Sequence, residues 1–98
     1  MGENEQLYVK EAFDTNWIAP LGPFVNRFEQ TIGDYVSDTI HVAALSSGTA
    51  AIHLALELLG ESQGDEVVCQ SFTFSASANP ILYLGATPIF IDSEPHTW

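Results

Sequence analysis

The sequence has 98 residues, 46% of them hydrophobic and 15% charged, with a formal net charge of −11 at pH 7. This balance argues against binding to nucleic acid or to an anionic membrane, because both need clusters of basic side chains. The single cysteine, Cys69, excludes an internal disulfide and a cysteine-rich zinc site, and the absence of a membrane-spanning or signal segment predicts a cytoplasmic protein.

Residues 1–39 are predicted to form N-terminal helices and a loop. Asn4 is placed to cap a helix over residues 4–14. Prolines and a glycine make residues 15–23 a loop, which either packs on the core or borders a cleft. Pro23 suits the first position of a second helix over 23–36. The aromatic residues of this helix are four and seven positions apart, which predicts that they lie on one face and belong to the core.

Residues 40–98 are predicted to form a β-α-β-α-β segment. A short apolar strand over 40–45 leads into a turn at 46–49 and a helix from about Thr49 to Leu59. This helix is apolar nearly all round, so we expect it to be buried on more than one side. Gly60 is placed to end it as a left-handed cap.

The second half of this segment repeats the alternation of strand and helix. A turn at Gly64 leads into a second strand that ends at Gln70, and residues 87–92 form a third strand. Between them lies a helix within residues 72–84, which Pro80 either kinks or confines to a start near Asn79. Strands separated by helices predict parallel pairing and the α/β class, with ligands bound beyond the carboxyl ends of the strands.

The turn at 46–49 is a candidate phosphate site. A helix start after a strand presents free backbone N–H groups and the positive end of the helix dipole, and Gly48 allows close approach. Lys10 and Arg27 are the only lysine and arginine, so backbone donors and hydroxyls must hold any phosphate here. An ordinary serine-capped helix explains the same pattern, and the residues alone leave both interpretations open.

No catalytic or metal-binding residue is predicted. The carboxylates form no obvious acid–base pair, and His41, His53 and His96 lack the spacing of metal ligands. We expect His53 to be an ordinary helix histidine. Phe72 and Phe74 either stack on a planar ligand or belong to the core, and their alternation is compatible with both.

The sequence closely resembles the DegT/StrS-type nucleotide-sugar aminotransferases over nearly its whole length. The resemblance lies in NWIAPLGP at residues 16–23, LSSGTAAIHLAL at 45–56, GDEV at 64–67, FTFSASAN at 72–79 and GATPIFID at 85–92. It implies a large-domain segment of the aspartate-aminotransferase fold, fold type I, and pyridoxal 5'-phosphate as cofactor. The backbone at Gly48, Thr49 and Ala50 would hold the cofactor phosphate, and Phe74 would stack on the pyridine ring.

The resemblance also implies a reaction and an assembly. Members of the family are homodimers that transfer an amino group, usually from glutamate, to a nucleotide-linked keto sugar, often for polysaccharide precursors. Their Schiff-base lysine and the aspartate that pairs with the pyridine nitrogen lie downstream of the matching region. We therefore expect an N-terminal fragment that is inactive alone. The alternatives are a small phosphate- or nucleotide-binding α/β module and a non-catalytic relative used in regulation or scaffolding.

Overall fold

The structure, a computed structural model, describes residues 2–37 and 39–97. Its backbone contacts divide the chain into two units, Met1–Ala44 and Leu45–Trp98. The boundary that the sequence suggested, between residues 39 and 40, stays a prediction.

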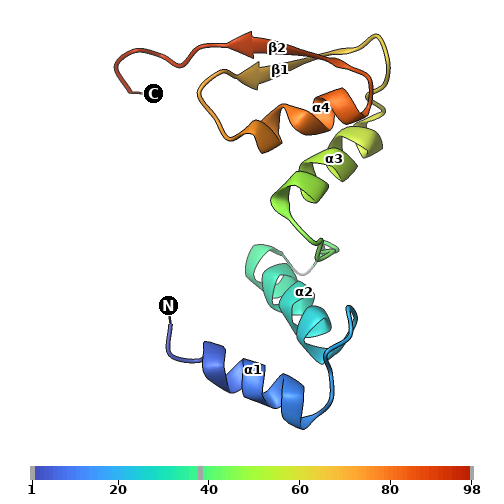
Figure 1. The fold of residues 1–98 in the computed structure, drawn as a ribbon, viewed down its shortest axis with the longest axis vertical. Helices are drawn as coiled ribbons and strands as arrows, with labels where there is room; N and C mark the ends of the chain where they lie inside the picture. Colours follow the sequence, from blue (N-terminus) through green and yellow to red (C-terminus); the bar gives the residue numbers. More distant parts are fainter. Residues whose placement is uncertain (1, 38, 98) are drawn as a thin grey trace. The chain divides into compact units, whose positions relative to one another are not determined.

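The first unit contains two helices, α1 (Glu5–Asp14) and α2 (Pro23–Val36), joined by the predicted loop (Figure 1). Both helices lie where the sequence placed them. Asn4 precedes α1 as predicted, but its side chain makes no capping hydrogen bond. The reason is its helical backbone conformation, with φ −105° and ψ −8°, whereas a capping side chain needs an extended one.

The aromatic residues of α2 do not form a core, and this part of the prediction was wrong. No residue of α2 is buried, and the Tyr35 side chain is 88% exposed. The loop before α2 is also open to solvent, since Ile18 and Leu21 are both exposed. The apolar spacing marked the correct helix, but among the described residues the Tyr8 ring of α1 covers only part of its aromatic face, at Phe24.

Residues 40–45 do not form the predicted strand. A strand requires a hydrogen-bonded neighbour, and the amides of this segment find other acceptors. The Ile40 amide bonds the Ser37 carbonyl at 3.3 Å, and the Ala44 amide bonds Oε1 of Glu29 at 2.7 Å. The segment is therefore attached to α2 instead of to a sheet.

The second unit contains α3 (Gly48–Leu59), β1 (Glu66–Gln70), the 3-10 turn η1 (Ser75–Ser77), α4 (Asn79–Tyr83) and β2 (Thr87–Ile91). The strands pair in parallel, with Glu66 opposite Thr87 and Gln70 opposite Ile91 (Figure 1). The predicted parallel pairing is thus confirmed, in a sheet of two strands instead of three. Pro80 lies at the start of α4, which settles the open alternative in favour of a late start.

Gly60 ends α3 in the left-handed conformation, with φ 90°, as predicted. A left-handed residue at this position lets the last helical carbonyls accept hydrogen bonds from the chain that follows. The amides of Gly60 and Glu61 donate to the carbonyls of Glu57 and Leu56.

The core of the second unit is small. Cys69, Ile81 and Ala86 form it together with Pro80, so the cysteine thiol is buried as expected. The expectation that α3 is buried on more than one side was wrong for this structure. No residue of α3 is buried, and Leu58 is 79% exposed. Helix α3 packs on α4 and η1, and Leu58 and Leu59 near its end stay exposed.

Apolar as it is, α3 spans only 12 residues. None of the helices in the described residues has the length and hydropathy that crossing a membrane requires.

Candidate cofactor-phosphate site

The start of α3 leaves two backbone N–H groups free. Ser47 precedes the helix in an extended conformation, and its hydroxyl oxygen accepts the Ala50 amide at 3.1 Å. Its carbonyl accepts the Ala51 amide, also at 3.1 Å. Within the described residues, the Gly48 and Thr49 amides have no acceptor. The serine cap therefore occupies one of the three amide donors predicted for the phosphate, that of Ala50, and leaves the other two.

The space beside these amides is open. A Cβ atom added to Gly48 would meet no atom within 4 Å, so a ligand can approach this backbone closely. The Thr49 hydroxyl makes no hydrogen bond to a described residue and is a further donor. Residues 45–98 contain neither lysine nor arginine. Neutral donors and the helix dipole are therefore what this unit offers to an anion, and they fit a phosphate group.

The predicted aromatic turn follows β1. Phe72 and Phe74 are 72% and 80% exposed, so neither ring belongs to the core, which removes one of the two interpretations left open by the sequence. Phe74 directly precedes η1, and η1 contacts α3. The turn that carries Phe74 therefore adjoins the helix that carries Gly48 and Thr49. Which ring contacts a ligand stays a prediction.

Hydrogen bonds fix this turn to the end of β2, and sequence reasoning missed them. The Ser71 amide bonds the Ile91 carbonyl at 2.8 Å, and its hydroxyl bonds Oδ1 of Asp92 at 3.4 Å. The Gln70 side-chain amide donates to the Ser93 hydroxyl. These partners lie 20 or more residues apart in sequence, so only the parallel register could have revealed them. Within the turn, the hydroxyls of Thr73 and Ser77 lie 3.0 Å apart.

A cavity of about 340 Å³ lies between α3, β1 and α4. Its three polar side chains are Gln70, Thr73 and Ser77, near the turn. The rest of the lining is apolar and consists of Ile52, Leu56, Val67, Val68, Cys69 and Ile81. None of the predicted site residues lines it. We regard it as a packing space between these elements and not as the phosphate site.

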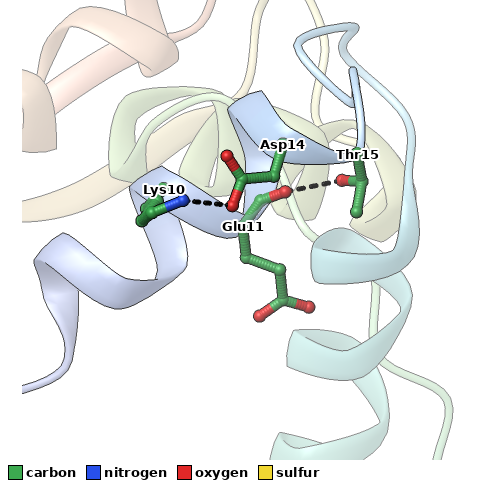
Figure 2. Close-up of polar contacts among 4 residues, drawn as sticks. All are labelled: Lys10, Glu11, Asp14 and Thr15. Carbon is green, nitrogen blue, oxygen red and sulfur yellow. Dashed lines mark hydrogen bonds and ion pairs between the residues drawn. The ribbon is translucent and has the colours of Figure 1, made fainter.

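Lys10 is engaged in a local ion pair. Its ammonium group pairs with Oδ2 of Asp14, one turn along α1, and the Thr15 hydroxyl donates to the Glu11 carbonyl at 2.7 Å (Figure 2). Both side chains of the pair are exposed. The chain's single lysine therefore stands in an ordinary i,i+4 pair on a helix surface.

The contact of His53 with α4 fits the prediction of an ordinary helix histidine. His53 meets the Tyr83 ring edge to face, with 5.4 Å between ring centroids, as an ordinary helix histidine would. Among the residues that the structure describes, no three histidine, cysteine or acidic side chains are grouped to hold a metal ion.

Comparison with known proteins identifies close relatives. The chain is 61% identical over its whole length to EpsN of Bacillus subtilis, provisionally named a pyridoxal phosphate-dependent aminotransferase. It is 45% identical over 97% of its length to the GDP-perosamine synthase of Caulobacter vibrioides. Among solved structures, Spr1654 of Streptococcus pneumoniae, provisionally named a sugar aminotransferase, superposes on 99% of the chain with a TM-score of 0.85 and 33% identity. It has been solved in PLP, PMP and apo forms.

The chain spans about a quarter of the length of these proteins, 25% of both relatives and 24% of the structural neighbour. The predicted fold class is confirmed by this likeness. The model of the DegT/DnrJ/EryC1/StrS aminotransferase family matches residues 1–98. The chain belongs to this family.

Proposed function

We propose that this chain is part of a longer pyridoxal 5'-phosphate-dependent aminotransferase, in which it holds the cofactor phosphate. The amino group would pass from a donor, usually glutamate in such enzymes, to a nucleotide-linked keto sugar. Perosamine is linked to GDP in the product of one relative, which supports the substrate class. The proposal extends to polysaccharide or glycan precursor biosynthesis in the cytoplasm.

The observation that carries the proposal is the pair of amides at Gly48 and Thr49 that have no acceptor among the described residues, in a unit without lysine or arginine. An anion at this point receives two backbone hydrogen bonds and the field of the α3 dipole. The Thr49 hydroxyl adds a third donor. Bonds from these groups to a charged phosphate are each worth about 1.5–3 kcal/mol, enough to hold a cofactor without an arginine.

The chain's other contribution is orientation. When bound, the cofactor supplies an electron sink for amine transfer. Phe74 would cover one face of its ring, held by the bonds from Gln70 and Ser71 to the end of β2. We assign no proton transfer to residues of this chain, since neither the phosphate site nor the aromatic turn contains a lysine, histidine or carboxylate. The group that moves protons would come from the remainder of the enzyme.

Homodimer formation is the remaining part of the proposal. Large apolar side chains are exposed in both units, including Leu58, Leu59 and Val68 of the second. Exposed apolar side chains of this number call for a cover, either from the remaining three quarters of the protein or from a second subunit.

Thr49→Val in the full-length protein tests the site and the reaction together. We expect weaker binding of pyridoxal 5'-phosphate in titration, and slower amine transfer from glutamate to a GDP-linked keto sugar followed by mass spectrometry. Thr49→Ser is the control and should retain both. Equal cofactor affinity in Thr49→Val would contradict the site. Tight cofactor binding without transfer to any nucleotide-linked sugar would favour a non-catalytic relative.

A further inference from the structure

The first unit contains an aromatic cleft that the cofactor site does not use. Its volume is about 440 Å³, and it is lined by Tyr8 of α1 and by Phe24, Arg27, Phe28 and Thr31 of α2. This volume lies within the range of small-molecule sites. The cleft is formed entirely by residues of the first unit.

Arg27 is held in the cleft by two rings. Its guanidinium carbon lies 4.8 Å from the Phe24 ring centroid and 5.2 Å from the Tyr8 centroid. The two rings meet edge to face at 5.8 Å. A cation–π contact uses the ring electrons and takes no N–H donor out of use. No described residue accepts a hydrogen bond from the guanidinium, so its planar set of N–H donors is available to a ligand.

The charge of Arg27 is also uncompensated. The chain contains 13 acidic residues and two basic ones. Lys10 pairs with Asp14, whereas Arg27 pairs with no carboxylate among the described residues. In a chain of net charge −11, most of the surface repels anions, so an unpaired guanidinium in a cleft marks the place where an anion is best accepted.

We propose that the aromatic cleft binds the nucleoside diphosphate part of the substrate. Arg27 would bind phosphate oxygens with two parallel N–H bonds, a geometry that guanidinium favours over ammonium. The exposed ring of Phe28 would lie against the base. The Thr31 hydroxyl hydrogen is already used, since it is donated to the Arg27 carbonyl at 2.7 Å. The Arg27 guanidinium is therefore the group of this cleft that we expect to donate to a phosphate. The identity of the ligand rests on the proposed function, while the site rests on the cleft itself.

Saturation-transfer NMR with GDP tests this inference on the full-length protein. We expect saturation of the guanine proton from the parent chain. In Arg27→Met, the affinity for GDP should fall at least tenfold, which corresponds to about 1.4 kcal/mol. Arg27→Lys should bind more weakly than the parent, because an ammonium group cannot form two parallel bonds. Lys10→Met, which removes the compensated cation, should bind GDP like the parent.

Two further ligands show which chemical groups of GDP the cleft recognises. Guanosine should bind more weakly than GDP, and glutamate should not displace GDP. Equal GDP binding by the parent and Arg27→Met would overturn the inference, and so would displacement by glutamate. If circular dichroism shows that Arg27→Met loses helix, the comparison of Arg27→Lys with the parent decides in its place, and equal affinity overturns the inference. A parallel titration with pyridoxal 5'-phosphate, followed at the Thr49 amide, tests the cofactor site separately.

Discussion

The Ser47 hydroxyl oxygen accepts the Ala50 amide hydrogen at 3.1 Å, and this bond determines which donors remain free at the start of α3. It occupies one of the three amides assigned to the cofactor phosphate and leaves those of Gly48 and Thr49. Any ligand that uses all three must therefore replace the serine cap. The cap and the phosphate compete for Ala50, which gives a direct way to separate folding from binding.

Ser47→Ala should loosen α3 and spare the cofactor. Loss of a serine cap costs about 0.5–2 kcal/mol of helix stability. Faster amide hydrogen exchange in α3 would measure this loss. Cofactor affinity should be unchanged or higher, because the Ala50 amide becomes available to the phosphate. Ser46→Ala, which removes a neighbouring hydroxyl that caps nothing, is the matched control. Unchanged exchange in Ser47→Ala would mean that the cap contributes nothing to α3.

Gly48→Ala should have the opposite effect, weaker cofactor binding with an intact fold. A Cβ at this position meets nothing within 4 Å, and Gly48 does not have a positive φ. Gly→Ala at such a position stabilises a fold by about 0.4–1 kcal/mol, through the unfolded state. The added methyl group would, however, occupy the open space beside the amides. Thermal unfolding and cofactor titration of the full-length protein measure the two effects.

Gly60→Ala is the control for this experiment. Gly60 has φ 90°, so alanine there is strained and should lower stability, although the residue lies at the far end of α3 from the site. An equal loss of cofactor affinity in both variants would contradict a specific role of Gly48 beside the cofactor phosphate.

Local signals predicted the helices well. Pro23, the apolar spacing of α2 and Gly60 each act within a few residues of the boundary that they mark, so the sequence was sufficient to place α2 and the end of α3. The strand expected at 40–45 depends on a hydrogen-bonded neighbour, which a local pattern cannot supply. The bond from Ser71 to Asp92 likewise exists only because β1 and β2 pair in parallel.

Burial was the least predictable property, because it depends on what lies against each face. The apolar faces of α2 and α3 were recognised, yet Tyr35 and Leu58 remain exposed. For the site, the free amides followed from the position of the helix start. That the Ala50 amide donates to the Ser47 hydroxyl could be learned only from the structure, because a serine before a helix is compatible with both capping and ligand binding.

Phe74→Ala should weaken cofactor binding without unfolding the protein. The ring is exposed, so the fold loses little, whereas stacking on a planar ligand is worth about 0.5–1.5 kcal/mol beyond area burial. Cofactor titration with Phe72→Ala as the matched variant distinguishes the two rings. If Phe72→Ala weakens the cofactor and Phe74→Ala does not, the stacking role belongs to Phe72.

The turn after β2 should open at acid pH. The Thr97 hydroxyl and the amides of His96 and Thr97 donate to the Glu94 carboxylate and hold its pKa below the ordinary glutamate value of 4.5. The stabilisation is therefore present above pH 4.5 and is lost as the pH falls through the lowered pKa. The amide chemical shifts of His96 and Thr97 should titrate together in this range. In Glu94→Gln they should show no such transition, and persistence of the transition would assign it to another group.

The position of the cofactor phosphate tests the central claim most directly. A crystal structure of the full-length protein with pyridoxal 5'-phosphate locates the phosphate oxygens relative to α3. We expect them within hydrogen-bond distance, about 2.7–3.2 Å, of the Gly48 and Thr49 amide nitrogens, with the Phe74 ring against the pyridine. A phosphate held elsewhere, with both amides bonded only to water or protein, would contradict the account.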